Sequence, residues 1–363
     1  MTYKVIGIMS GSSLDGLDIA FTTLNERGGK WEYEIQAASC LPYSVDWINR
    51  LKQATTLSAY EYQLLHTAYG KFVGSQVNAF IEKNGLEHQV QLISSHGHTT
   101  FHAPHLGMTA QLGDGAAIAA ETGINVVSDL RAMDVAFGGQ GAPIVPIGEK
   151  LLLSEYTMFL NLGGIANISA ETKNGYVAFD VCPANKILNM LVQAEGKDYD
   201  DNGTIAASGS VHTTLLTKLN ALSYYQLPFP KSLDNGFGVN EVFPIVQSFG
   251  LSTAGALRTY VEHIAMQVGY SCTGFGANGQ GANMLVTGGG AFNGFVLQRL
   301  RHQLAALNIQ VVVPTADLVN YKEALIMALI GVLRWREEYN VINTVTGARR
   351  NSINGAVWIG QEA

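Results

Sequence analysis

Apolar residues along the chain follow two spacings, and stretches with the two spacings alternate. Short runs rich in β-branched residues predict strands, and longer stretches with apolar residues three and four positions apart predict helices. The expected strands lie at 90–94, 125–128, 158–162, 176–180, 284–288 and 309–314, besides the two that flank residues 11–15. Such alternation is typical of an α/β protein.

Three helices are predicted most clearly. The first covers 57–83 and stops at Asn84-Gly85, and the second follows Leu-Ser-Thr at 251–253, where a hydroxyl can cap it. The third, at 321–338, is apolar around most of its circumference, with Ala324, Leu325, Leu329, Val332, Leu333 and Trp335. We expect a helix of this kind to be buried between layers.

The length and the placement of glycine and proline predict two domains. A chain of 363 residues exceeds the size at which one hydrophobic core keeps growing. Glycine and proline concentrate at 125–145, where we expect the chain to pass from one domain to the next. The first domain should therefore comprise 1–127 and 340–363, and the second 128–339.

Charge and cysteine content argue against several classes of function. The formal net charge of −7 is spread along the chain without a basic stripe, which argues against a nucleic-acid partner. No apolar run reaches the roughly 20 residues of a membrane helix. The chain starts without a basic leader, and its three scattered cysteines form no CxxC pair, so we expect a cytoplasmic protein.

Three glycine-rich turns each follow an apolar strand. They are Gly11-Ser12-Ser13 with Asp15, Gly16 and Asp18; Gly163-Gly164; and Gly288-Gly289-Gly290, after which a helix is expected. Glycine lets backbone amides approach an anion closely, and a helix N-terminus adds positive potential. One such turn is a weak signal, but three at strand ends favour phosphate binding. The third has neither the dinucleotide-binding spacing nor the Gly-Lys-Ser/Thr of a Walker loop.

Longer motifs carry a resemblance to a known family. GIMSGSSLDGLD, SHGHTTFHAP, GGQGAPIVPIG, LNLGGIANI, TGGGAFN and VTGAR occur in this order over almost the whole chain. Together they resemble the 1,6-anhydro-N-acetylmuramic acid kinase family. The resemblance implies a two-domain α/β fold of the actin-like ATPase type, similar to sugar kinases and heat-shock chaperone ATPases, with a nucleotide cleft between the domains.

The resemblance also implies an activity and a set of partners. The expected enzyme is a phosphotransferase of peptidoglycan recycling that uses ATP and Mg²⁺ and acts on an amino sugar. It would open the anhydro bridge with water and yield N-acetylmuramic acid 6-phosphate. Its partners would be the sugar and ATP, and the chain is expected to form a homodimer.

The site residues follow motif by motif. The first phosphate loop would contain Gly11, Ser12, Ser13, Asp15, Gly16 and Asp18, the second Gly163, Gly164 and Asn167, and the nucleoside loop Gly288, Gly289, Gly290 and Asn293. Asp180 matches the catalytic aspartate of the family, and His96 with Gly97 would form a wall of the sugar pocket. We expect Asp15, Asp18 and Glu323 near Mg²⁺ or its waters.

Some of these residues also have simpler explanations. Asp180 follows the apolar run YVAF, and an aspartate at a strand end is more often a turn or helix cap; the motif match favours the catalytic base. Glu323 stands at the beginning of the expected helix, where an acid favours the helix dipole in any case. Arg131, which follows Asp129, could bind a substrate carboxylate or form a surface ion pair.

Four histidines suggest a different chemistry. His96, His98, His102 and His105 lie within ten residues, a density that could bind zinc in a hydrolase. No cysteine accompanies them, which makes this interpretation the weaker one.

The chain departs from the family pattern at three places. Family members typically read Gly-Thr-Ser in the first loop, Gly-Phe-Asp-Thr-Gly-Pro-Gly-Asn around the catalytic aspartate, and Lys-Ser-Thr-Gly-Arg-Glu further on. This chain has Gly-Ser-Ser at 11–13, Ala-Phe-Asp-Val-Cys-Pro-Ala-Asn at 178–185 and Lys-Ser-Leu-Asp-Asn-Gly at 231–236. The missing arginine leaves open a kinase of the same fold for another sugar or anhydrosugar. A non-catalytic, chaperone-like ATPase module is a further alternative.

Overall fold

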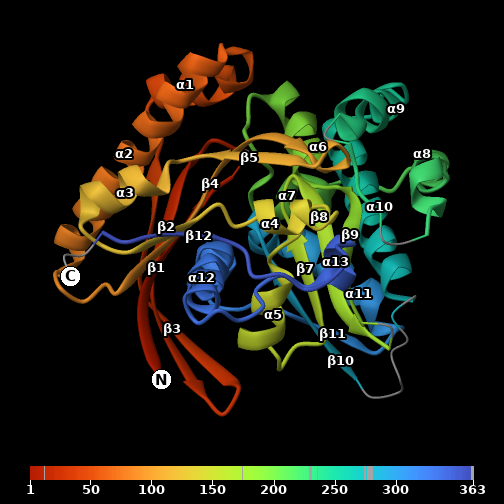
Figure 1. Cartoon of the computed structure of the whole chain (residues 1–363). Helices are drawn as coiled ribbons and strands as arrows, with labels where there is room; N and C mark the ends of the chain where they lie inside the picture. Colours follow the sequence, from red (N-terminus) through yellow and green to blue (C-terminus); the bar gives the residue numbers. More distant parts are fainter. Residues whose placement is uncertain are drawn as a thin grey trace. The chain divides into compact units, whose positions relative to one another are not determined.

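The computed structural model divides into two compact units (Figure 1). It describes residues 1–11, 13–173, 175–228, 231–234, 236–273, 275 and 281–360. The first unit contains Met1–Ser154 and Tyr321–Ala363, and the second contains Glu155–Asn320. The units thus divide later along the chain than the domains expected from sequence, and 128–154 and 321–339 belong to the first unit.

Most elements of the first unit come from the first part of the chain. They are β1 (Thr2–Ser10), β2 (Gly16–Arg27), β3 (Lys30–Pro42), α1 (Val45–Gln53), α2 (Ala59–Asn84), β4 (Leu92–Ala103), β5 (Met108–Leu112), α3 (Gly115–Thr122), β6 (Val126–Ser128), α4 (Ala132–Ala136) and α5 (Pro146–Leu152). From the end of the chain come α12 (Ala316–Trp335), which begins in the second unit, α13 (Asn343–Thr346) and β12 (Ala356–Trp358).

Among the described residues, the strands of the first unit form a sheet in the order β12-β6-β4-β1-β2-β3, with β5 paired to β4. The strands β1, β2 and β3 are antiparallel neighbours, while β4 and β6 are added in parallel beside β1. Helices α2 and α3 lie on one side of this sheet and α12 on the other (Figure 1). The carboxyl ends of β1, β4 and β6 therefore meet at one edge.

Close contacts explain why α5 and most of α12 belong to the first unit. A Cβ atom on Gly7 of β1 would lie 1.9 Å from the carbonyl oxygen of Ala324, so backbone meets backbone. Lys322 Nζ lies 2.9 Å from Glu149 Oε1 of α5, and both side chains are buried. Every residue from Ala324 to Ile330 is buried, as the apolar pattern predicts, whereas Trp335 is 44 % exposed.

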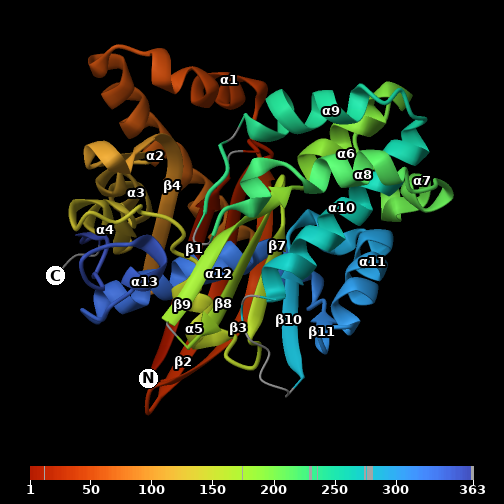
Figure 2. The ribbon, with the colours of Figure 1, turned by 90° about the vertical axis from the view of Figure 1, so that its right-hand side faces the viewer.

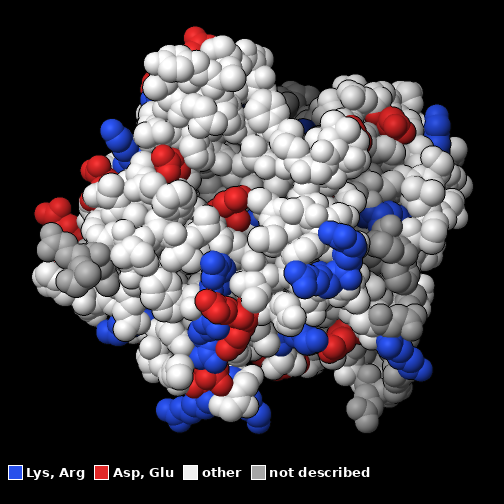
Figure 3. All heavy atoms as spheres, viewed as in Figure 1, with Lys and Arg blue, Asp and Glu red and all other residues white. Residues whose placement is uncertain are grey.

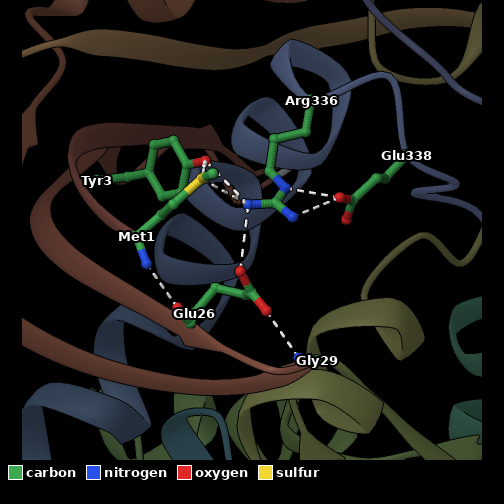
Figure 4. A network of polar contacts seen from close by, with 6 residues as sticks. All are labelled: Met1, Tyr3, Glu26, Gly29, Arg336 and Glu338. Atoms are coloured by element: carbon green, nitrogen blue, oxygen red, sulfur yellow. Dashed lines mark hydrogen bonds and ion pairs between the residues drawn. The ribbon is translucent and has the colours of Figure 1, made fainter.

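The far end of α12 is tied to the first hairpin (Figure 4). Nη1 of Arg336 donates to the Tyr3 hydroxyl at 3.0 Å and lies 3.4 Å from Glu26 Oε2, and Nε donates to Glu338 at 2.7 Å. Glu26 also accepts from the backbone N–H of Gly29 in the turn between β2 and β3. These contacts fix the end of the sheet opposite to the glycine-rich loop.

The second unit contains a second sheet and a helical layer. Its elements are β7 (Met158–Leu162), β8 (Ile165–Thr172), β9 (Gly175–Pro183), α6 (Asn185–Val192), α7 (Thr204–Ser208), α8 (Thr213–Asn220), α9 (Phe243–Gln247), α10 (Thr253–Thr273), β10 (Ala282–Thr287), α11 (Gly294–Ala305) and β11 (Ile309–Val312). Short 3₁₀ or π turns lie at Gln193–Glu195, Asp201–Gly203, Ser223–Gln226, Gly238–Val242 and Gly289–Phe292, and in the first unit at Ala54–Thr56 and Pro104–Leu106.

The described strands of the second sheet lie in the order β11-β10-β7-β8-β9 (Figure 2). Again the first three strands along the chain are antiparallel neighbours, and two further strands are added in parallel beside the first. The two units therefore repeat one topology, which agrees with the two-part α/β fold expected from sequence. A hydrophobic core formed by the sheet, α6, α10 and α11 supports the second unit.

The predicted strands and helices are confirmed with small shifts. The helix expected at 57–83 is α2, which Ser58 and Glu61 cap reciprocally and which ends at Gly85 with φ 62°. Ser252 accepts from the backbone N–H of Gly255 in the first turn of α10. No helix among the described residues has the length and apolar character needed to cross a membrane. On the face shown in Figure 3, Lys and Arg lie among Asp and Glu rather than in a separate patch.

Candidate functional site

The loop between β1 and β2 is the first of the three glycine turns. Ser13 Oγ donates to Asp15 Oδ1 at 2.6 Å, and the same oxygen accepts from the N–H of Gly16 at 3.1 Å. A Cβ on Gly11 would lie 3.4 Å from Ser13 Oγ, an ordinary contact distance, whereas a Cβ on Gly16 would lie 2.6 Å from Cys40 Sγ. Gly16 is therefore required by packing against β3, and Gly11 is not. Ser12 lies outside the described residues.

A chain of buried hydroxyl groups supports the end of β1 just before this loop. Ser10 Oγ lies 2.9 Å from His98 Nδ1 and accepts from the Tyr43 hydroxyl at 2.7 Å, which in turn lies 2.6 Å from the Tyr69 hydroxyl. Sequence reasoning missed Ser10, Tyr43 and Tyr69. The three residues lie far apart in the sequence, at the end of β1, after β3 and in α2, and belong to no shared motif. Their contacts fix the direction in which the loop leaves β1.

Three carboxylates predicted for the metal interact in the first unit. Burial raises the pKa of Asp18 to about 6, a hydrogen bond from Cys40 opposes the rise, and the negative charges of Asp15 and Glu323 add to it. Among the described residues, no group of three His, Cys, Asp or Glu side chains is arranged to hold a metal ion directly. Glu323 lies in the interior of α12, which begins at Ala316, and not at its beginning as expected.

Arg131 follows β6 and faces β4. Its Nε donates to His96 Nε2 at 2.7 Å, and its Nη1 donates to the carbonyl of Gly141 at 2.6 Å. His96 Nδ1 lies 2.8 Å from the carbonyl oxygen of Gly97, so this nitrogen carries the proton and Nε2 accepts. Burial, and then the charge of Arg131, lower the pKa of His96 to about 3. Arg131 therefore forms no surface ion pair among the described residues, because its acceptors, His96 Nε2 and the carbonyl of Gly141, are both uncharged.

Asp134 holds the loop that contains Gly141. The buried carboxylate accepts from the N–H of Gly141 at 2.8 Å and from the hydroxyl of Thr346 at 2.7 Å. The backbone N–H of Asp134 donates to Asn354 Oδ1. The Gly-Gly-Gln-Gly-Ala-Pro motif at 138–143 is therefore held by the buried carboxylate of Asp134. Sequence reasoning did not include Asp134 in the site.

Three of the clustered histidines have separate partners. His98 contacts Ser10, His102 Nδ1 lies 3.1 Å from Thr109 Oγ1, and His96 accepts from Arg131. His105 lies beyond the strand, in the 3₁₀ turn Pro104–Leu106. The described imidazoles do not form the shared site that the zinc interpretation requires.

Asp129 and Gly97 line a pocket of about 300 Å³ in the first unit, together with His96. Asp129 has φ 58°, a conformation that aspartate tolerates better than most residues. Gly97 has φ 73°, and a Cβ there would lie 2.5 Å from the carbonyl oxygen of Leu112, so β5 requires a glycine at this position. Arg131 is not among the residues that line the pocket.

In the second unit, Gly163 and Gly164 form the turn between β7 and β8. Their carbonyls accept from the N–H groups of Ala184, Asn185 and Lys186, which places the start of α6 against this turn. A Cβ on Gly163 would lie 3.4 Å from the carbonyl oxygen of Ile165, and a Cβ on Gly164 would lie 3.8 Å from Lys186 Cβ. Both are ordinary contact distances, so packing does not require glycine at either position, as at Gly11.

The third turn divides in the same way. Gly288 and Gly290 pack against the end of β7, where an added Cβ would lie 2.6 Å from Asn161 and from Leu162 respectively, while a Cβ on Gly289 would make only an ordinary contact of 3.7 Å with Asn185. Asn293 Oδ1 caps α11 by accepting from the N–H of Val296 at 3.0 Å. Asn293 thus has a structural task in addition to the expected ligand contact.

Asp180 lies inside β9 and not at its end, because β9 continues to Pro183 past an irregularity in its pairing with β8. One carboxylate oxygen accepts from Asn167 Nδ2 of the neighbouring strand. The other accepts from the N–H of Leu233 at 2.8 Å and from Ser232 Oγ at 3.2 Å. Asp180 is therefore neither a turn residue nor a helix cap. Asn167 thus orients this carboxylate, and its expected contact with a phosphate stays a prediction.

The two altered segments of the second unit differ in their relation to Asp180. Val181, Cys182 and Ala184 are buried in the hydrophobic core, so these replacements affect packing. In the other segment, Ser232 matches the family pattern, and Leu233 contributes only its backbone N–H to Asp180. Of 233–235, Asn235 lies outside the described residues. The departures thus leave the hydrogen bonds of the carboxylate in place.

The model of the anhydro-N-acetylmuramic acid kinase family matches residues 3–360 of the chain. The chain belongs to this family. A curated anhydro-N-acetylmuramic acid kinase from Shewanella woodyi is 33 % identical, and the match covers 97 % of this chain and 98 % of the relative. One from Vibrio cholerae is 34 % identical, with 97 % of each chain covered.

Solved structures are more distant from this anhydro-N-acetylmuramic acid kinase family member. The activator of 2-hydroxyisocaproyl-CoA dehydratase from Clostridium difficile, with bound ADPNP, is 14 % identical with a TM-score of 0.46, and the match covers 93 % of this chain and 96 % of the activator. The family resemblance expected from the motifs is confirmed by the family model and the curated relatives, which span the same length as the chain.

Proposed function

We propose that the chain, a carbohydrate kinase by family, transfers the γ-phosphate of ATP to 1,6-anhydro-N-acetylmuramic acid and opens its anhydro bridge with water. The products are N-acetylmuramic acid 6-phosphate and ADP. The observation that carries the proposal is the carboxylate of Asp180, which three donors from two segments hold in one orientation while it stays partly accessible. A reaction that activates water needs a base with a fixed direction.

Asp180 would take the proton of the attacking water. The water oxygen forms a bond to the anomeric carbon as the bond from that carbon to the bridge oxygen breaks. The released oxygen then forms a bond to the γ-phosphorus, and ADP leaves. Asn167, Ser232 and the N–H of Leu233 keep the carboxylate in place during these steps.

The glycine turns of the two units would bind ATP. Packing does not require glycine at Gly11, Gly163, Gly164 or Gly289, and we propose that their backbone amides approach a phosphate, to which Ser13 adds a hydroxyl. Gly16, Gly288 and Gly290 would shape these turns, as packing requires, and Asn293 would orient the third turn at the start of α11. Ser12 remains part of the proposal through its motif alone.

The donor set of the first unit fits Mg²⁺. Asp15, Asp18 and Glu323 supply carboxylate oxygens, the ligands that Mg²⁺ prefers, and their mutual repulsion favours a cation near them. The lack of a direct three-residue site suits an ion that keeps most of its waters. When bound with ATP, Mg²⁺ offsets the negative charge of the phosphates.

Arg131 would bind the carboxylate of the sugar acid. Its guanidinium keeps its charge although burial lowers its pKa to about 10, and its Nη2 makes no hydrogen bond to any described residue. His96 holds the guanidinium from one side. Gly97 and Asp129 remain proposed neighbours of the sugar through their place beside His96.

The remaining proposals concern the setting of the enzyme. We propose a cytoplasmic homodimer that binds neither nucleic acid nor membranes. The interspersed charges of Figure 3 and the net charge of −7 support the part about nucleic acid.

The test measures ADP release from Mg-ATP with and without 1,6-anhydro-N-acetylmuramic acid, with mass analysis of the product. The proposal expects ADP release that depends on the sugar, and a product heavier than the sugar by one phosphate and one water. ADP release that another sugar stimulates instead would place the chain with a different substrate. ATP hydrolysis that no sugar changes would favour an ATPase module.

A further inference from the structure

Strand β9, which contains Asp180, is the last strand of the second sheet among the described residues, so one of its edges has no neighbouring strand. An edge strand directs the N–H and C=O groups of alternate residues away from the sheet. Where β8 passes from Asn167 to Ala166, β9 advances by two residues instead of one. Val181 is the extra residue and forms a β-bulge beside Asp180. The backbone of Asp180 is therefore left to be held from outside the sheet.

Two residues outside the sheet hold this backbone. The N–H of Asp180 donates to the carbonyl of Lys231 at 3.1 Å, and the hydroxyl of Tyr224 donates to the carbonyl of Asp180 at 2.7 Å. Lys231 Nζ in turn donates to the carbonyl of Tyr224 at 3.2 Å and lies 4.7 Å from the centre of the Tyr224 ring. The three residues thus form a closed circuit of hydrogen bonds that includes the proposed base.

The side chain of Tyr224 is itself fixed in place. It is 7 % exposed, and its ring packs against the rings of Tyr225 and Phe237, whose centroids lie 5.7 and 5.5 Å away. Burial, and then the negative charge of Asp180, raise the pKa of Tyr224 above its usual value, so the hydroxyl keeps its proton and acts as a donor. The hydroxyl of Tyr225 has a different partner and lies 3.1 Å from Nε2 of the buried His263.

Fixing both backbone groups of Asp180 fixes the direction of its side chain. Its backbone nitrogen and carbonyl carbon flank the Cα atom, and their positions determine where the Cβ atom points. The contacts of Ser232 and Leu233 with the carboxylate hold only the far end of the side chain. Because a misplacement of about 1 Å in an active site can reduce a rate by about 100-fold, the loss of a backbone contact at this position has a kinetic cost.

We propose that Tyr224 is a positioning residue for the proposed base, because its hydroxyl holds the β-bulge at Asp180 in the orientation that aims the carboxylate at the attacking water. Lys231 supports this contact by holding the carbonyl of Tyr224. The proposal rests on the proposed function, in which Asp180 takes the proton of that water. Tyr224 acts through Asp180 and needs no contact of its own with the sugar or with ATP.

The first measurement compares two neighbouring tyrosines. Tyr224→Phe removes the hydroxyl and keeps the ring, and we expect kcat for sugar-dependent ADP release to fall by about 10-fold, with KM for ATP and KM for the sugar unchanged. Tyr225→Phe is the matched control, since it removes a hydroxyl whose partner is His263 and not Asp180. The control should lower the midpoint of chemical denaturation at least as much as Tyr224→Phe does and leave kcat unchanged.

The second measurement separates positioning from a merely structural role. If Tyr224 acts through the carboxylate, Tyr224→Phe lowers kcat by about 10-fold in the unaltered chain and does not lower it further in a chain that already carries Asp180→Asn. Lys231→Met keeps the stem of the side chain and removes the ammonium group. It should show the same dependence on Asp180, with a loss of about 3- to 10-fold, and it provides the test if Tyr224→Phe does not fold.

The outcomes distinguish failure of this proposal from failure of the proposed function. A large loss of kcat in Asp180→Asn beside an unchanged kcat in Tyr224→Phe would overturn the positioning role alone. Equal losses from Tyr224→Phe with and without the carboxylate, or a change in KM instead of kcat, would overturn it as well. Turnover by Asp180→Asn near that of the unaltered chain, or ADP release that no sugar stimulates, would contradict the proposed function, and the positioning role would fail with it.

Discussion

The two sheets share one strand order and differ in the side chains at their loops. In both units a hairpin turn follows the first strand, and two parallel strands are added beside it. The hairpin of the first unit carries acids, Asp15 and Asp18. The hairpin of the second carries two glycines that packing does not require, followed by Asn167, which donates to Asp180. One topology therefore supplies two backbone turns, and the chemistry differs through a few polar residues.

The proposed function places the catalytic base, Asp180, in the second unit. Asp180→Asn keeps the size of the side chain and removes its ability to take a proton. We expect kcat to fall by about 10³-fold, within the range for loss of a general base. Steady-state ADP release measures this, and Asp201→Asn at an exposed position of the same unit is the control. Turnover near that of the unaltered chain would show that the base lies elsewhere.

The proposed function places recognition of the sugar carboxylate in the first unit, at Arg131. Arg131→Lys cannot keep both of the bonds that the fork of the guanidinium makes to His96 and Gly141. We expect kcat/KM for the sugar to fall by about 10- to 100-fold, chiefly through KM, with KM for ATP unchanged. Arg50→Lys on exposed α1 serves as the control. An equal rise of both KM values would contradict a role specific to the sugar.

The altered segment at 181–184 is assigned to packing and not to catalysis. Cys182 is fully buried in the core of the second unit. Cys182→Gly, which restores the residue typical of the family, should lower the free energy of unfolding by about 2 kcal/mol, since it removes buried atoms and adds backbone freedom. Chemical denaturation measures this. A variant with unchanged stability and altered sugar preference would show that residues 181–184 contribute to sugar recognition.

The smallest effect concerns the outer support of Asp180. Ser232→Ala removes a donor at 3.2 Å and leaves the N–H of Leu233 and the amide of Asn167. We expect kcat to fall by about 3- to 10-fold with KM for ATP unchanged, as for one hydrogen bond of ~1 kcal/mol. Ser248→Ala, at an exposed position, is the control. A loss as large as that from Asp180→Asn would mean that Ser232 itself takes part in the reaction.

The sequence predicted the elements and the site to different degrees. Periodicity and caps located α2, α10 and the strands, because local spacing determines which face is apolar. It could not locate the unit boundary, since Gly7 meets Ala324 across more than three hundred residues. The sequence also could not distinguish glycines that close packing requires, such as Gly16, from those where an added Cβ would make only ordinary contacts, such as Gly11.

Site residues without a motif were missed for the same reason. Asp134, Ser10 and Tyr43 act through partners far along the chain, such as Thr346 for Asp134. Asn167 was found through its motif, but the sequence does not show that it pairs across the sheet with Asp180. Cross-strand pairing follows from register, which a list of motifs does not contain.

The contact between Gly7 and Ala324 has a consequence for how this chain varies over generations. A first side-chain carbon at position 7 would lie 1.9 Å from a carbonyl oxygen that cannot be moved without displacing α12. Any residue other than glycine at position 7 therefore requires α12 to move, and we expect such a substitution to destabilise the first unit. Strand β1 and helix α12 lie near opposite ends of the sequence, and each limits which residues the other can contain, as neighbours in the sequence do.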